Sequence, residues 1–548
     1  MSEERAAGAA EEARVERSRL VRRAGIVGAG TFASRVLGLV REMVLAALFS
    51  RDATDAFFAA FTIPNALRQL LAEGAVSSAL VPVLSAKLAN EGDESARAFV
   101  QRARGVSLVA LGVATVLGMV FATPLTELFA GGYHSRPGEF ERTVAVTRWV
   151  FPYIFFMGTA AVGMACLHAK KEFAVASFAP GLLNVAQIAA AFALIPLLVA
   201  QGIDPVHALT IGALVGGALQ VVAQWPSLRR LGFLRPPRID FADPSVREML
   251  RRMGPMTFGV GVYYIDLTLS RRFLSELGPG AQSYFNWAQR LCDFPQGIFV
   301  MALSTAALPS LAALAAQGAT GEIAKTYAHG MRLAMFVALP ASVLMVALSE
   351  PVVAALFQRG AFDGAAARET AKALVWQGGA IWTVAAVRQT IPVFYALGET
   401  RTPVIVSALD LLAFLVAALL LRGPMGHVGI SVAIAVSSAV QMVLLVAALR
   451  MRIGALHGRE IAGAMARTAG ASLVAAAAGI ATVRGRAGGG LGGAAGKTVL
   501  PGVASGVVFG LVFLVAAHIL GSEELRLLSG GVRRRLARRR TAAGAPRN

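Results

Sequence analysis

The chain has 548 residues, of which 56% are hydrophobic and 15% are charged, and its formal net charge is +20. Because soluble globular proteins carry about 25% charged residues, this composition excludes an ordinary soluble protein and predicts a polytopic membrane protein. The positive charge lies mostly in short connections between apolar segments. It therefore indicates membrane topology and contact with anionic lipid rather than binding of nucleic acid.

The chain begins with a charged tail and continues as a series of apolar segments. Residues 1–23 mix acidic residues and arginines without an apolar stretch, so we expect a cytoplasmic tail and no cleavable signal peptide. Between residues 24 and 520 the apolar segments suffice for roughly fourteen transmembrane helices, since each crossing needs about 20 apolar residues. The predicted fold class is therefore all-α, and the arginine-rich segment 521–548 is predicted to be a second cytoplasmic tail.

The first two predicted spans carry charged residues at membrane depth. A charge inside a bilayer is costly and usually faces a watery cavity or a partner of opposite charge. Asp55 lies at the start of the second span, where a carboxylate suits a helix N-terminus and would also line an outer gate. The remaining charges are three arginines and two acids: Arg35, Arg41, Arg68, Glu42 and Glu73.

A short internal repeat predicts how the helices are grouped. The segment AVSSALVPVLS at 75–85 aligns with ALSTAALPSLA at 302–312, so that Pro82 falls on Pro309. Parallel repeats of this kind are a transporter architecture, with the binding site between the halves near the middle of the membrane. The predicted parts are two lobes of about six helices each, a basic cytoplasmic linker and a C-terminal helix pair: 24–228, 253–450, 229–252 and 451–520.

The second lobe contributes a fourth arginine, Arg290, in the segment YFNWAQRLCDFPQG. It lies just before Pro295 and Gly297, and such breaks are tolerated in a membrane where the backbone lines a cavity. Arginine binds phosphate through two parallel hydrogen bonds, so the four arginines predict a cavity for a phosphate or pyrophosphate group. The alternative is that nearby acids neutralise them as structural ion pairs: Glu42, Glu73 and Asp293.

Two further acids lie within predicted spans, Asp266 in the seventh and Asp410 in the eleventh. Each is a candidate site for a coupling cation or a proton. The alternative is a neutral carboxylic acid that bonds to a neighbouring hydroxyl group.

Other patterns carry no chemistry. GAGTFA at 28–33 fits a dinucleotide-binding pattern, but no strand precedes it, and its small residues favour close helix packing. The seven histidines are scattered, and the two cysteines, Cys166 and Cys292, each lie within an apolar segment. These patterns predict neither a metal site nor a disulfide, and nothing in the residues indicates an enzyme.

Several segments together resemble the bacterial MurJ (MviN) lipid II flippases of the multidrug/oligosaccharidyl-lipid/polysaccharide exporter superfamily. These segments are SRVLGLVRE, TDAFFAAFTIPNALRQLLAEGAVSSALVPVLS, WVFPYIFF, FAPGLLN and NWAQRLCDFPQGI. The resemblance implies a multi-pass protein of the bacterial cytoplasmic membrane with both termini in the cytoplasm. It implies that the protein moves undecaprenyl-pyrophosphate-linked peptidoglycan precursor to the periplasmic leaflet by alternating access.

The resemblance also implies roles for particular residues. The four arginines match the family's cavity arginines, proposed to bind pyrophosphate, and the helix pair 451–520 matches a groove for the lipid tail. This chain departs from the family at Glu42, Gln69 and Gln289, where the family commonly has Asp, a second Arg and an acid. The other positions that match functional residues are Ser34, Asp55, Glu73 and Ser283.

Several questions stay open at this point. No cofactor is expected. Transport is expected to be driven by a sodium ion, a proton or the membrane potential. The choice among these stays open because the family's sodium-site residues do not align cleanly with this chain. The expected partners are lipid II, membrane lipids and a cell-wall synthesis or division complex. The alternatives are a flippase for another polyprenyl-linked oligosaccharide, a cation-coupled exporter, a membrane enzyme or a division scaffold. A basic cavity argues against an exporter of cationic drugs.

Overall fold

The computed structural model describes residues 2–68, 77–259, 261–297, 301–487 and 494–527. Within these ranges every regular element is a helix, which confirms the predicted all-α class. Nine of the described helices are long and apolar enough to cross a membrane. The predicted number of roughly fourteen spans is not confirmed.

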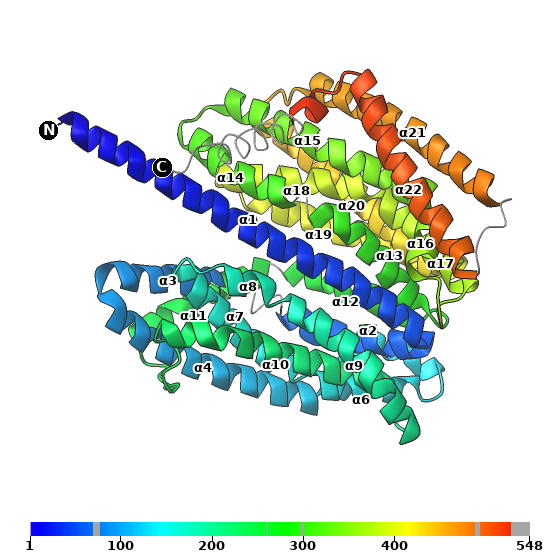
Figure 1. Ribbon diagram of the computed structural model, residues 1–548, viewed down its shortest axis with the longest axis horizontal. Helices are drawn as coiled ribbons and strands as arrows, with labels where there is room; N and C mark the ends of the chain where they lie inside the picture. The colour runs from blue at the N-terminus through cyan, green and yellow to red at the C-terminus, as the bar shows by residue number, and fades with distance from the viewer. Residues whose placement is uncertain (1, 69–76, 260, 298–300, 488–493, 528–548) are drawn as a thin grey trace, which may run out of the picture. The chain divides into compact units, whose positions relative to one another are not determined.

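The chain divides into two compact units, residues 1–283 and residues 284–548 (Figure 1). Residues 229–283 belong to the first unit by their contacts. The two units are defined by their internal contacts, whereas the predicted lobes were defined by the internal sequence repeat. The predicted lobe boundaries therefore stay a prediction. Unit 1 contains α1 (Ser2–Leu48), α2 (Arg51–Arg68), α3 (Ser77–Asn90), α4 (Gly92–Val120), α5 (Ala122–Ala130), η2 (Gly131–Ser135), α6 (Glu139–Val150), α7 (Tyr153–Ala169), α8 (Ala174–Phe178), α9 (Gly181–Ala200), α10 (Val206–Arg230), α11 (Pro244–Gly259), α12 (Gly261–Ser275) and the start of α13 (Ala281–Pro295).

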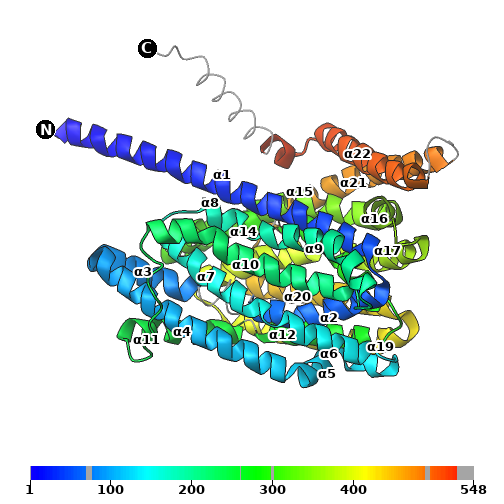
Figure 2. The ribbon, with the colours of Figure 1, turned by 60° about the horizontal axis from the view of Figure 1, so that its bottom comes forward.

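A core of buried aliphatic and aromatic side chains joins α3, α4 and α7 in unit 1. Leu80, Phe99 and Cys166 are among its members. The Cys166 and Cys292 thiols are both free and buried. Figure 2 shows α3, α4, α7 and α11 side by side in this region. Burial of several large side chains, each contributing about 1.5–3 kcal/mol, stabilises this part of the unit.

Unit 2 packs its last two helices against a long central helix. α21 and α22 bury Phe509 and Phe513 against Phe336 of α15 and Leu348. Arg332 of α15 pairs with Glu523 and Glu524, at 2.5 and 2.7 Å, in the segment after α22. The elements of this unit, besides the rest of α13, are α14 (Met301–Ala316), α15 (Thr320–Ala347), α16 (Ser349–Phe357), α17 (Gly364–Gly379), α18 (Ile381–Ala396), α19 (Arg401–Met425), α20 (His427–Ile453), α21 (Gly458–Ala487) and α22 (Ala494–Ile519).

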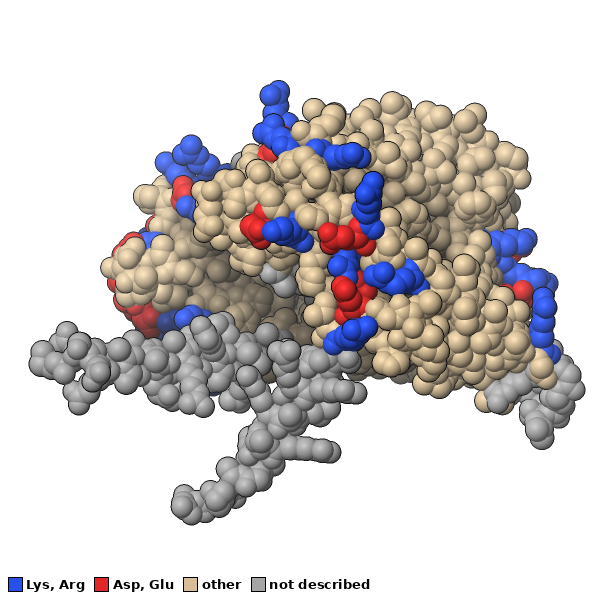
Figure 3. All heavy atoms as spheres, turned by 90° about the horizontal axis from the view of Figure 1, so that it is seen from above, with Lys and Arg blue, Asp and Glu red and all other residues tan. Residues whose placement is uncertain are grey.

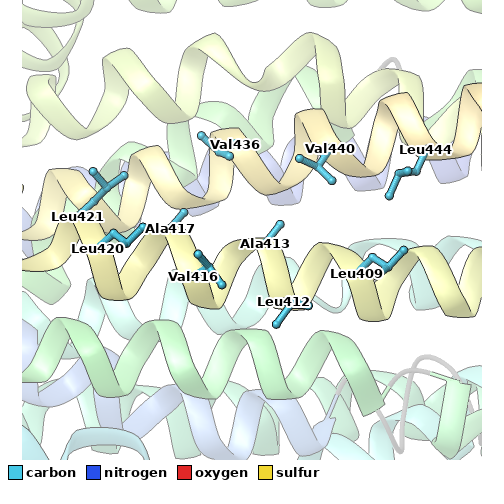
Figure 4. Close-up of a pocket in the computed structure, with 10 residues that line it drawn as sticks. All are labelled: Leu409, Leu412, Ala413, Val416, Ala417, Leu420, Leu421, Val436, Val440 and Leu444. Atoms are coloured by element: carbon cyan, nitrogen blue, oxygen red, sulfur yellow. The ribbon is translucent and has the colours of Figure 1, made fainter.

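The outer faces of the apolar helices are suited to lipid. α19 and α20 enclose a groove of about 550 Å³ whose ten lining residues are all aliphatic, from Leu409 to Leu444 (Figure 4). On the face drawn in Figure 3, charged side chains gather in a few groups with wide uncharged areas between them. Many large apolar side chains on these helices are exposed, such as Leu420, Val443 and Leu511, which is the expected surface of a membrane protein.

Candidate functional site

Asp55 lies in α2 but caps a different helix. Its buried carboxylate accepts hydrogen bonds from the backbone N–H groups of Gly280 and Ser283, both at 2.8 Å, and from Ser283 Oγ at 2.6 Å. These donors lie at the N-terminal end of α13, where the first N–H groups of a helix lack intrahelical acceptors. Asp55 therefore caps α13 although it belongs to α2. A capping residue normally stands directly before the helix whose N–H groups it accepts from. The structure brings together two of the predicted residues, Asp55 and Ser283.

Arg136 and Thr54 complete this capping network. Arg136 Nη1 lies 3.4 Å from Asp55 Oδ2, and Arg136 also donates to the carbonyl oxygen of Leu277. Thr54 Oγ1 is 2.7 Å from Ser283 Oγ. The sequence analysis did not identify Arg136, although an arginine in a short connection between apolar segments is visible in the sequence. The network ties α2, the chain after η2 and the start of α13 into one buried polar cluster.

Arg41 and Glu42 form a second polar cluster, within α1. They make a close ion pair, and both side chains are buried. Arg41 Nη1 also donates to Gln187 Oε1 of α9 at 3.1 Å, and Gln187 Nε2 donates to the carbonyl oxygen of Leu209 of α10 at 3.3 Å. A buried charge needs such partners. These contacts favour a structural role for Arg41, which was the alternative to direct phosphate binding; sequence reasoning missed Gln187.

The predicted residues Ser34 and Arg35 lie one and a half to two turns before Arg41 on α1. Ser34 contacts α9 through its backbone, because its carbonyl oxygen accepts a hydrogen bond from Asn184 Nδ2 at 3.1 Å. Arg35 is partly buried. Asn184 and Gln187 together hold α1 against α9, so they determine where the arginines of α1 lie.

Arg68 ends the described part of α2. Its Nε donates to Asn65 Oδ1 at 3.0 Å, one turn earlier and just after Pro64. Its side chain is partly buried. Glu73, predicted to support the cavity, lies outside the described residues.

Arg290 is the predicted arginine of unit 2 and the most exposed of the four. Its side chain is 43% exposed, and Nη1 lies 3.9 Å from Asp293 Oδ2 on the same helix. Beside it, Trp287 is buried against Phe357 and Phe362 and anchors this part of α13. A long, half-exposed ion pair of this kind is worth about 0–1 kcal/mol.

Asp266 and Asp410 lie in different units and are both partly buried, on α12 and α19. Asp410 bonds to Ser437 of α20, and Gln441 Nε2 donates to Ser407 Oγ nearby at 3.4 Å. Within the described ranges, no three His, Cys, Asp or Glu side chains are grouped as metal ligands.

Comparisons with known proteins agree on one family. The family described as "Lipid II flippase MurJ" matches residues 44–486. A relative from Burkholderia cenocepacia named "Lipid II flippase MurJ" is 35% identical over 77% of this chain and 82% of its own. A "Probable lipid II flippase MurJ" from Vibrio cholerae is 33% identical over 80% of this chain and 84% of its own.

Solved structures show the same fold. A structure titled "Lipid II flippase MurJ, inward closed conformation" superposes with a TM-score of 0.72 at 21% identity, covering 90% of this chain and 98% of that one. An inward-facing multidrug resistance MATE family transporter of the MOP superfamily gives a TM-score of 0.62 at 16% identity, covering 78% and 96%. The chain therefore shares the fold of these two proteins.

Proposed function

The chain belongs to the lipid II flippase MurJ family, and we propose that it moves lipid II from the cytoplasmic to the periplasmic leaflet of the bacterial inner membrane. Membership also makes it a transporter and not an enzyme. The observation that carries the proposal is the family match over residues 44–486. In this setting the N- and C-termini lie in the cytoplasm, and a cell-wall synthesis or division complex is an expected partner.

The proposed mechanism is alternating access around a cationic cavity. Arg35, Arg68 and Arg290 bind the pyrophosphate, since a planar guanidinium matches phosphate oxygens in a bidentate manner. Arg41, paired with Glu42, supports the cavity by holding α1 on α9. The polyprenyl tail stays in the lipid phase, along α21 and α22, so that only the polar head group crosses the protein.

The capping network around Asp55 supports a gating role. Its polar groups are mutually satisfied while buried, and opening the cluster would expose them to water, which can replace each hydrogen bond at small net cost. Such a cluster can therefore close and reopen without a large energetic penalty. The membrane potential drives transport. Asp266 and Asp410 are candidate sites for a coupling cation or proton.

Complementation in cells depleted of their own lipid II flippase tests the proposed function. We expect the wild-type chain to restore growth, and Arg290→Ala and Arg68→Ala to fail at equal protein levels in the membrane. Arg459→Ala is a matched control, because Arg459 is exposed at the start of α21. Rescue by all variants would refute pyrophosphate binding by these arginines. Failure of a well-expressed wild type would indicate another polyprenyl-linked oligosaccharide as substrate.

A further inference from the structure

The connection between α10 and α11 is fastened to α4 instead of hanging free. We name residues 231–243 the strap. Arg104 Nη1 donates to the carbonyl oxygens of Phe233 and Arg235, at 2.8 and 3.2 Å, and Gln101 Nε2 donates to that of Pro236 at 2.7 Å. Because the bonds run to the strap backbone, they hold its path regardless of most of its side chains.

Side chains on the inner side of the strap add to this attachment. Phe233 is buried in the core of α3, α4 and α7. Arg235 pairs with both carboxylate oxygens of Glu94, at 2.5 and 2.8 Å. Arg102 pairs with Asp243 at 2.9 Å and with Asp240 at 3.5 Å. Bidentate and networked pairs of this kind keep their geometry better than isolated surface pairs.

The strap tip, residues 238–241, presents two large apolar side chains outwards. Ile239 is 61% exposed and Phe241 is 51% exposed. Asp240, between them, turns inwards to Arg102, and its Oδ1 also accepts from the N–H groups of Ala242 and Asp243, at 3.1 and 3.2 Å. The exposed Ile239 and Phe241 and the inward-facing Asp240 together give the strap tip an apolar outer side.

The tip lies beside the residue at which the uncharged part of α4 begins. The N–H of Arg238 donates to the carbonyl oxygen of Gln101 at 3.2 Å, and a Cβ at Gly105 would lie only 2.1 Å from the Arg238 carbonyl oxygen. From Gly105 to Val120 the helix has no charged residue, and this helix is one of the candidate membrane spans. Those fifteen steps cover about 22 Å, most of a hydrocarbon core of about 30 Å. Gly105 thus begins the uncharged part of this candidate span.

We propose that the strap tip is an interfacial anchor, in which Ile239 and Phe241 insert among phospholipid headgroups and Arg238 binds lipid phosphate. Exposed aromatic and aliphatic side chains next to arginine are the composition of segments that lie in the membrane interface. The acids of the strap are turned towards Arg102, so the outer side is apolar and basic and complements an anionic lipid surface. The anchor is independent of which lipid the protein transports.

Spin labels on the full-length protein in phospholipid nanodiscs test this anchor. Single Ile239→Cys and Phe241→Cys variants are labelled, and collision rates with oxygen and with a water-soluble nickel chelate are measured. Asn90→Cys, exposed at the end of α3, is the water control, and Val116→Cys, exposed on α4, is the lipid control. The unmodified chain is the labelling blank, because both native thiols are buried. We expect both tip labels to fall between the controls, with oxygen favoured over the nickel chelate.

Two results would overturn the proposal. Access to the nickel chelate equal to that at position 90 would place the tip in water. Protection from both reagents would mean that protein, such as a second copy of the chain, covers the tip. The role of Arg238 is tested by Arg238→Gln in the labelled Phe241→Cys background. We expect a shift of the label towards water in anionic nanodiscs and no shift in zwitterionic ones, and an unchanged depth in both would refute phosphate binding.

Discussion

At the residue scale, Asp55 illustrates how one carboxylate can stabilise a helix to which it does not belong. Asp55→Asn keeps one acceptor oxygen but removes the charge that faces the α13 N-terminus and Arg136. Loss of a capping interaction costs about 0.5–2 kcal/mol, so we expect a lower melting temperature of the purified protein and weaker rescue in the depletion strain. Asp52→Asn is the control, since Asp52 is exposed in the first turn of α2. Equal melting temperatures for the two variants would contradict the capping role.

Gln187 leads to a second prediction at this scale. Gln187→Leu has a similar size but leaves Arg41 Nη1 without the acceptor that now lies at 3.1 Å. An unsatisfied buried donor costs about 1–3 kcal/mol, so we expect a lower melting temperature and loss of rescue similar to that of Arg41→Ala. Gln201→Leu, at the exposed end of α9, should be neutral. If Arg41→Ala fails while Gln187→Leu rescues fully, Arg41 binds substrate directly and not through its support of α1.

At the element scale, α4 contains two glycines with opposite expectations. At Gly105 a Cβ would meet the backbone of Arg238, whereas at Gly112 nothing lies within 4 Å. Gly105→Ala should therefore displace the strap, and Gly112→Ala should stabilise the helix by up to about 1 kcal/mol. Limited trypsin digestion after Arg238 measures strap release directly. Equal protease resistance of the two variants would show that the strap does not depend on this close approach.

The helices also show which structural features periodicity and charge can predict. Long apolar segments predicted the all-α class correctly, because membrane-spanning helices need continuous apolar sequence. The count of spans was harder, since α17 and α18 are separate helices that meet at Ala380. The strap was expected to be a basic linker; its attachment depends on backbone carbonyls and on the missing side chain of Gly105, which composition does not reveal.

For the candidate site, charged residues in predicted spans indicated positions in polar clusters. The residues that bond to them could not be predicted from the sequence. Asp55 and Ser283 were both predicted, and the structure joins them across more than 200 positions of sequence. Arg41 was predicted as a ligand, but its contact with Gln187 of α9 could not be inferred, because a buried glutamine has no distinctive spacing. Local charge is readable from one sequence, whereas a hydrogen bond between distant helices depends on the completed fold.

At the scale of the whole molecule, a proposed flippase for an anionic head group must account for the direction of transport. An elementary charge crossing 100 mV changes its free energy by about 2.3 kcal/mol, which is roughly a 50-fold bias in an equilibrium constant. An interior-negative potential therefore favours outward movement of a pyrophosphate-linked lipid without any cofactor.

We expect proteoliposomes with an imposed potassium diffusion potential to flip lipid II faster than the same vesicles after the potential is collapsed. Flipping is followed by access of an added impermeant labelling reagent, and Arg290→Ala is the inactive control. An unchanged rate after collapse of the potential would show that the potential does not drive transport. If the rate instead depended on a sodium or proton gradient, and this dependence disappeared in Asp410→Asn, the Asp410 carboxylate would be the coupling site.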